Sequence, residues 1–290
     1  MRIEDKGDTR YFTFYTWGDW LDYVKGKSEM DDYSRASRQP DDNDWTKTKN
    51  WSEAIKLAEE GWEEGAKRIR EVGMPIFDKL SQLIEKQHVV YDVTGMELDV
   101  ATYLKGVPEC WMDFETKIER GVGVRHVKIT YNYCASWCVS SDVLVGRGAA
   151  VAALVELLEL AGYRVELWAV EATDPSWGGR GGAGSICRLR NQVLVKSSEQ
   201  PLDLSRVAFA LAHPAMLRRL AFSLMELQDK KTRDAAGVGG GYGMPCDIAK
   251  EVQGDLHFAH MHGSDSTWTD MKKTREWVAL QLVEQGVTLL

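Results

Sequence analysis

Three histidines lie close together near the carboxyl terminus of the sequence. His257, His260 and His262 follow Asp255 within eight residues, and Asp265 comes shortly after them. Imidazoles at this spacing bind Zn²⁺ or Ni²⁺ when a turn brings them together. On a continuous strand, however, His260 and His262 share one face and His257 points to the other. Between a metal site and a polar strand end with solvated histidines, we favour the polar strand end.

A second group of polar residues follows a predicted strand at residues 124–133. Asn132, Cys134 and Ser136 stand where that strand ends, and Asp174 comes after the next predicted strand. Ligands of open α/β sheets bind beyond the carboxyl ends of the strands. If the protein binds a small ligand, we expect these residues to contact it.

Two glycine-rich segments, residues 177–185 and 237–243, suggest phosphate-binding loops. The first lacks the Lys-Ser/Thr ending of a P-loop and does not open a helix directly, and the second follows no suitable strand. We therefore expect both to be surface loops or hinges. Arg180 and Arg188 would still give the first segment a local preference for anions.

The charge balance limits the classes of partner. The sequence holds 36 Lys and Arg against 44 Asp and Glu, a net charge of −8. This balance argues against a general nucleic-acid binder and against binding to anionic membranes. The longest apolar run, residues 149–158, is interrupted by Glu156 and is too short to span a bilayer. The first residues lack the apolar core of a signal peptide, so we expect a cytoplasmic protein.

The sequence carries no signature of the common catalytic classes. It has no GxSxG, HExxH or kinase motif. Its five cysteines are scattered and form no CxxC pair, so we expect buried free thiols, with a metal shared by Cys134 and Cys138 as the alternative. A protein without catalytic activity fits these observations best, and the only cofactor that they suggest is a divalent metal.

The first 120 residues predict a helical region with short strands. Asn50 is typical of a helix N-cap. Gly61 and Gly65 in that helix would let another element approach closely, and we expect Gly73 and Pro75 to end it. The other expected elements are a strand at 11–15, a helix at 17–24, a solvated loop at 26–49, a second helix from residue 76, and either a pairing of 89–92 with 96–100 or a short helix capped by Asp99.

After residue 121 the pattern changes to alternating strands and helices. Arg218 and Arg219 fall on an amphipathic helix, where we expect a solvated face beside a core-facing stripe. The expected elements are strands at 124–133, 163–170, 186–195, 255–261 and 287–290, and helices at 147–161, 203–211, 214–227 and 268–284. A helix between two strands predicts a parallel βαβ unit. We therefore predict an α/β domain at 121–290, with a mostly parallel, doubly wound, Rossmann-like sheet.

The loop at residues 132–136 resembles the start of a von Willebrand factor A-type domain. That family carries a D-x-S-x-S loop which, with a Thr and an Asp from later loops, holds a divalent cation through oxygen ligands. Ser136 matches the loop, whereas Asn132 stands in place of Asp and Cys134 in place of Ser. The resemblance covers about residues 124–290 and implies a degenerate metal site.

Three further segments resemble uncharacterised proteins of tailed bacteriophages. They are the tryptophan-rich helix at 50–65, the helix and strand at 147–166, and the His-Pro-Ala-Met-Leu-Arg-Arg run at 213–219. The resemblance implies a phage or prophage origin and action in the bacterial host cytoplasm. It implies no activity and no catalytic residues.

These observations lead to three hypotheses of function. The first is a non-enzymatic adaptor, because bacterial von Willebrand A-type modules commonly serve a AAA+ ATPase or an assembly complex; its partner would be an ATPase or a host protein. The second is an enzyme or a binder of a metal or nucleotide, with its site at the strand ends; its candidate residues would be Ser136, Glu171, Asp174 and the histidines near residue 260. The third is a counter-defence protein that sequesters a host immune factor or a signalling nucleotide, for which Arg180 in its glycine-rich loop is the only hint.

Overall fold

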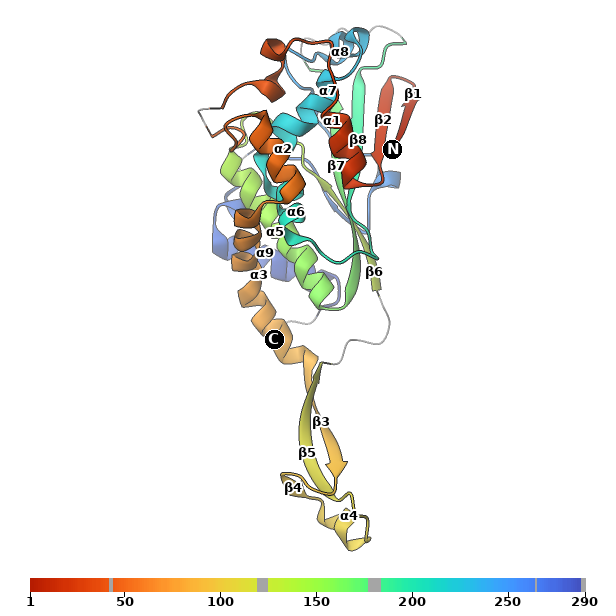
Figure 1. The fold of residues 1–290 in the computed structure, drawn as a ribbon, viewed down its shortest axis with the longest axis vertical. Helices are drawn as coiled ribbons and strands as arrows, with labels where there is room; N and C mark the ends of the chain where they lie inside the picture. Colours follow the sequence, from red (N-terminus) through yellow and green to blue (C-terminus); the bar gives the residue numbers. More distant parts are fainter. Residues whose placement is uncertain (42–43, 119–124, 177–183, 264, 288–290) are drawn as a thin grey trace.

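The computed structural model describes residues 1–41, 44–118, 125–176, 184–263 and 265–287 (Figure 1). The strands are β1 (Arg2–Lys6), β2 (Thr9–Phe14), β3 (Glu85–Asp92), β4 (Glu97–Leu98), β5 (Trp111–Ile118), β6 (Arg125–Asn132), β7 (Tyr163–Asp174), β8 (Arg188–Lys196), β9 (Met244–Pro245) and β10 (Leu256–Phe258). The α-helices are α1 (Trp17–Val24), α2 (Trp51–Glu60), α3 (Glu63–Ile84), α4 (Val100–Leu104), α5 (Ser141–Leu160), α6 (Leu204–Ala212), α7 (Phe222–Glu226), α8 (Lys230–Ala236) and α9 (Met271–Glu284). A π-helix (Met216–Ala221) precedes α7, and short 3₁₀ turns lie at Asp32–Ser34, Ala36–Arg38, Lys250–Val252 and Ser266–Trp268.

Within the described residues, seven strands form one mixed sheet in the order β1-β2-β8-β7-β6-β10, with β9 paired to the end of β7. The pair β6–β7 is parallel, as the pattern of strand, helix and strand predicts, and the pairs β6–β10 and β2–β8 are parallel as well. The pairs β1–β2 and β7–β8 are antiparallel. The described residues between β7 and β8, 175–176 and 184–187, form no helix, and a connection without a helix favours antiparallel pairing. The class is thus mixed α/β.

Helix α5 forms the centre of the helical layer. It begins at Ser141, earlier than the predicted start at 147, because Ser140 caps it by accepting a hydrogen bond from the backbone of Val143. Every residue of α5 from 143 to 155 is buried. The reason is that α5 packs on β7 and is also enclosed by α3, α6 and α9. Figure 1 shows α1, α2, α5 and α6 on the same side of the sheet.

The predicted helix from Asn50 is divided differently in the structure. Asn50 caps α2 as expected, but the helix stops at Gly61, whose φ is +91°. A new helix, α3, then runs through Gly73 and Pro75, so the prediction that these residues end a helix was wrong. A proline inside a helix costs about 3 kcal/mol. The burial of an α3 stripe, formed by Ala66, Ile69, Val72 and Ile76, offsets that cost.

Residues 85–118 form a separate three-stranded sheet, which we call the arm. The expected pairing of 89–92 with 96–100 was wrong, because β3 pairs with β5 along its whole length and β4 pairs with the start of β5. The alternative prediction of a short helix is confirmed: Asp99 caps α4 by accepting from the backbone of Ala101 and Thr102. Figure 1 shows the arm extending away from the rest of the molecule, with α4 near its tip.

The predicted solvated loop at 26–49 is partly buried. Arg35, Ser37, Thr46 and Thr48 are each less than 5% exposed. Arg35 pairs with Glu226. The other three contact Arg219, which donates to the hydroxyls of Thr46 at 3.2 Å and Thr48 at 2.7 Å and to the carbonyl of Ser37 at 3.0 Å. The prediction of a solvated loop, and of a solvated face at Arg218 and Arg219, was therefore wrong. The loop and the two arginines bury one another.

Some predictions fall outside the described residues. These are the glycine-rich segment around Arg180 and, except for its first residue, the predicted last strand at 287–290. The predicted division into residues 1–120 and 121–290 also falls in such a segment, residues 119–124, and stays a prediction. Among the described helices, none has both the length and the apolar composition that crossing a membrane requires.

Candidate functional site

A cavity of about 560 Å³ lies beyond the carboxyl ends of β6 and β7, a size typical of small-molecule sites. Cys134 and Ser136, which follow β6, line it together with Thr173 near the end of β7. The rest of its wall comes from the loop at 44–48, the π-helix, α7 and the glycine-rich loop at 237–243. These further lining residues include Trp45, Trp137, Ser176, Leu217, Arg218, Phe222, Tyr242, Gly243 and His262.

Arg218 brings a buried positive charge to this cavity. Its side chain is 2% exposed, and its guanidinium stacks on the ring of Trp45 at 3.3 Å. It donates to the carbonyls of Trp45 and Val139, both at 2.6 Å, and to the hydroxyl of Ser141 at 2.8 Å. All three acceptors are uncharged. Burial lowers the pKa of Arg218 to about 10, against the opposing effect of Asp41, so the group remains a cation at neutral pH.

The π-helix presents Arg218 and Leu217 to the cavity. Such wide helical turns are rare and often occur at functional sites. The turn follows His213, whose ring is 4% exposed and accepts a hydrogen bond from the backbone of Ala215 at 3.1 Å. Burial lowers the pKa of His213 to about 3, which keeps the ring neutral in its apolar surroundings.

Aromatic rings form much of the cavity wall. Phe222 and Tyr242 stack with their centroids 4.0 Å apart and their planes 16° from parallel. Tyr242 is held in place because its hydroxyl donates to Glu226 at 2.7 Å. Trp137, by contrast, is 84% exposed at the mouth. Flat ring faces arranged around a cavity suit a planar ligand.

The glycine-rich loop at 237–243 lies directly on the sheet. Gly243 has φ +80°, and a Cβ atom there would lie 2.6 Å from Cβ of Thr173. Only glycine fits such a close approach in this backbone conformation. Gly240 is exposed, as expected for a surface loop, and Gly240, Gly241 and Gly243 also line the cavity.

Of the other residues predicted at this edge, Asn132 and Asp174 are bonded to protein groups, and Cys134 is a buried thiol. Asn132 is fully buried; its side-chain oxygen accepts from the backbone of Cys134 at 3.1 Å and its amide donates to the carbonyl of Cys246 at 2.9 Å. Burial, reinforced by Glu171, raises the pKa of Cys134 well above its usual range, which keeps it a thiol. Asp174 pairs with Arg190 at 2.8 Å and with Arg188 at 3.2 Å, contacts that lower its pKa although burial raises it.

Two of the three histidines near residue 260 contact each other, and the third contacts other side chains. His260 and His262 face each other with Nε2 atoms 2.5 Å apart, whereas His257 lies 2.8 Å from the hydroxyl of Thr130 and 2.7 Å from Asp247. Asp255 accepts from the backbone of Lys128, and Asp265 caps the turn at Ser266–Trp268. In the part of the chain that the structure describes, no three His, Cys, Asp or Glu residues are placed to hold a metal ion.

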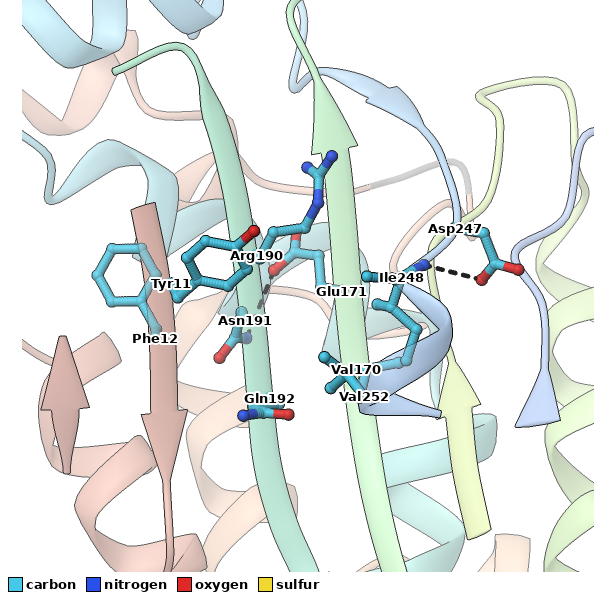
Figure 2. Close-up of a pocket in the computed structure, with 11 residues that line it drawn as sticks. Tyr11, Phe12, Val170, Glu171, Arg190, Asn191, Gln192, Asp247, Ile248 and Val252 are labelled. Atoms are coloured by element: carbon cyan, nitrogen blue, oxygen red, sulfur yellow. Dashed lines mark hydrogen bonds between the residues drawn. The ribbon is translucent and has the colours of Figure 1, made fainter. Parts of the chain in front are cut away.

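A buried polar cluster on three strands was not predicted from the sequence. Asn191 donates to the hydroxyl of Tyr133 at 2.9 Å. It also donates to the carboxylate of Glu171 at 3.4 Å (Figure 2). Tyr133 donates to the same carboxylate at 3.3 Å. Burial raises the pKa of Glu171 to about 7. The one available signal was the presence of polar residues inside otherwise apolar strands.

A smaller pocket, of about 310 Å³, lies over β2, β7 and β8 (Figure 2). Tyr11, Arg190, Gln192 and Ile248 are among the residues that line it. Arg190 in its described lining is already paired with Asp174. This pocket is therefore a weaker candidate for binding a charged ligand than the cavity at the strand ends.

The arm carries a concentration of exposed apolar side chains. Met96 is 80% exposed and Leu104 is 78% exposed, while Cys110 is 5% exposed. Other exposed apolar residues of the arm are Val89, Tyr91, Val93, Val100, Tyr103, Val107, Trp111 and Phe114. Residues 89–114 hold five Asp or Glu against one Lys, a net charge of −4. The arm is thus an apolar surface interspersed with negative charges.

These features define a mixed α/β protein with a ligand-sized cavity at the carboxyl edge of its sheet and an exposed β-arm. The chain belongs to the family of the domain of unknown function DUF7192, whose model matches residues 7–285. No curated protein and no solved structure matches the chain.

Proposed function

We propose that the protein is a non-enzymatic adaptor and that the arm is the surface through which it docks on a protein partner. The observation that carries this proposal is the exposure of ten large apolar side chains on the arm, of which Met96 and Leu104 are the most exposed. A concentration of exposed apolar side chains of this kind is typical of interaction sites, because their burial against a partner removes them from water.

The charges of the arm select the kind of partner. Its net charge of −4 between residues 89 and 114 favours a partner with an apolar centre and a basic rim. The same charge disfavours a second copy of the arm, because like charges would face each other. Nucleic acid is disfavoured for the same reason.

The finer parts of the proposal rest on sequence resemblance. The likeness of residues 124–290 to a von Willebrand A-type module supports an adaptor that serves a AAA+ ATPase or an assembly complex. The likeness to tailed-bacteriophage proteins supports a phage origin and action in the cytoplasm of the bacterial host. In this arrangement the arm would provide a contact surface separate from the α/β sheet.

An affinity capture from phage-infected host lysate tests the proposal. The full chain and the double variant Met96→Ser, Leu104→Ser serve as baits, and captured proteins are identified by mass spectrometry. Both side chains are largely exposed, so their truncation leaves the fold intact. We expect one partner, with a basic surface, that the full chain enriches and the arm variant loses.

A matched control uses exposed apolar residues outside the arm. Leu280 and Val283 on α9 are 54% and 52% exposed, and the variant Leu280→Ser, Val283→Ser should retain the partner. Capture that the arm variant retains, or that both variants lose equally, would exclude the arm as the docking surface.

A further inference from the structure

The cavity at the strand ends holds a cation that no described carboxylate neutralises by direct contact. The three hydrogen bonds of Arg218 reach two backbone carbonyls and one hydroxyl. They use three of the five N–H groups that a guanidinium offers, which leaves two donors without a partner among the described residues. A guanidinium in such a position recognises phosphate or carboxylate oxygens, because both charge and geometry match.

The acidic side chains around this cavity are already engaged. Glu226 pairs with Arg35 at 2.9 Å, and Asp174 pairs with Arg190 at 2.8 Å. Among the lining residues that the structure describes, none is Asp or Glu. The hydroxyls of Ser136 and Ser176 and the ring of His262 supply further polar contacts. The direct lining therefore favours a negatively charged group over a positive one.

The same cavity offers flat apolar faces. Phe222 and Tyr242 form one stacked wall, and Trp137 stands exposed at the mouth. A free inorganic anion would leave these rings without contact, whereas a planar ring would cover them and lose its own contact with water. A ligand that contacts both the guanidinium of Arg218 and these rings must carry an anionic group and a planar ring.

We infer that this cavity binds a small anion that carries a planar ring, with its anionic group at Arg218 and its ring against Phe222, Tyr242 and Trp137. Nucleoside monophosphates and aromatic carboxylates share this chemistry, and the cavity of about 560 Å³ is in the range for such molecules. The inference is independent of the arm, because none of the cavity's lining residues belongs to residues 85–118.

Isothermal titration calorimetry on the full chain tests the inference. The probes are the four nucleoside monophosphates, indole-3-acetate, inorganic phosphate and adenosine. We expect a ring-bearing anion to bind at least about tenfold more tightly than inorganic phosphate or adenosine, because only it can use both parts of the site. Whether a phosphate or the carboxylate binds more tightly identifies the anionic group. Absence of saturable binding by every ring-bearing anion would overturn the inference.

Two variants locate the bound ligand. Arg218→Gln should weaken binding by about tenfold or more, and Arg218→Lys should restore only part of it, since lysine lacks the planar fork. Arg218 also supports the loop at Trp45, so a second variant, Trp137→Ala, tests the site without changing that loop. The side chain of Trp137 is exposed and dispensable for folding. Its loss should weaken binding about fivefold. Tyr33→Ala, an exposed ring that does not line the cavity, is the control. Unchanged affinity in folded Arg218→Gln or in Trp137→Ala would contradict the assignment.

Discussion

The carboxylate of Glu226 lies 2.9 Å from Nε of Arg35, a residue 191 positions earlier in the chain. Both side chains are almost fully buried, at 0% and 4% exposure. The same carboxylate accepts from the backbone of Ser37 at 3.0 Å and from the hydroxyl of Tyr242 at 2.7 Å. Glu226 therefore joins the loop that contains Arg35 to the ring wall of the cavity.

Glu226→Gln is expected to destabilise the protein strongly. The substitution removes the buried charge partner of the Arg35 guanidinium, and breaking a buried ion pair in this way costs about 3–5 kcal/mol. The free energy of unfolding, measured by urea denaturation, should fall by that amount. Asp32→Asn provides the control, because Asp32 contacts the same arginine at 3.4 Å but is 79% exposed. A similar loss in both variants would show that burial of the pair is not the cause.

The five cysteines should differ sharply in reactivity. Cys138 is exposed, whereas Cys110, Cys134 and Cys187 are buried and Cys246 is half-buried. Burial raises the pKa of Cys246 to about 11, which makes its thiolate scarce. Reaction with Ellman's reagent should show one rapid thiol in the folded protein and the remaining thiols after denaturation. Cys138→Ser should remove the rapid phase; if that phase persists, another cysteine is accessible.

The strand-helix-strand unit of β6, α5 and β7 could be predicted because its signal is local. Apolar alternation in the strands and a capped helix between them are properties of adjacent residues. The edge at which the cavity lies could be predicted as well, since the strand-end rule led to Cys134 and Ser136. The less favoured alternative of a metal site at the histidines received no such support, because among the described residues no three potential ligands are placed to hold a metal ion.

The burial of Arg218 and Arg219 could not be predicted because their partners are remote. In the sequence these arginines read as the polar side of an amphipathic helix. Arg219 instead donates to Thr48, 171 positions away, and Arg218 to Trp45, 173 positions away. The position of Tyr242 at the cavity could not be predicted either, because Tyr242 lies in a loop whose glycines gave only a weak local signal. Long-range pairing thus decides the chemistry of the site.

Gly61→Ala should destabilise the protein more than Gly162→Ala. Both glycines have φ +91°, a conformation that strains any L-residue. A Cβ atom at Gly61 would in addition lie 2.3 Å from Oγ of Ser205, whereas one at Gly162 would meet no atom within 4 Å. We expect a loss of about 1 kcal/mol at Gly162 from backbone strain and about 2 kcal/mol or more at Gly61 from strain and overpacking. Equal losses in thermal or urea unfolding would indicate that the contact with α6 adds nothing.

The buried carboxyl of Glu171 should make stability depend on pH. Its pKa is about 7 in the folded protein, raised by burial from an ordinary value of 4.5. Between these two pH values the unfolded chain releases the proton while the folded protein keeps it. The free energy of unfolding therefore falls as pH rises, by about 1 kcal/mol per pH unit, and this contribution becomes constant above the folded pKa.

Glu171→Gln isolates this contribution from the other titrating groups. The variant cannot ionise at this position, so its stability relative to the wild type should increase by about 3 kcal/mol between pH 4.5 and pH 8. Urea denaturation at intervals of half a pH unit measures the difference. Glu199→Gln, at an exposed position, should follow the wild type throughout. A constant difference between Glu171→Gln and the wild type would mean that Glu171 ionises at its ordinary pKa, with solvent reaching the cluster of Tyr133 and Asn191.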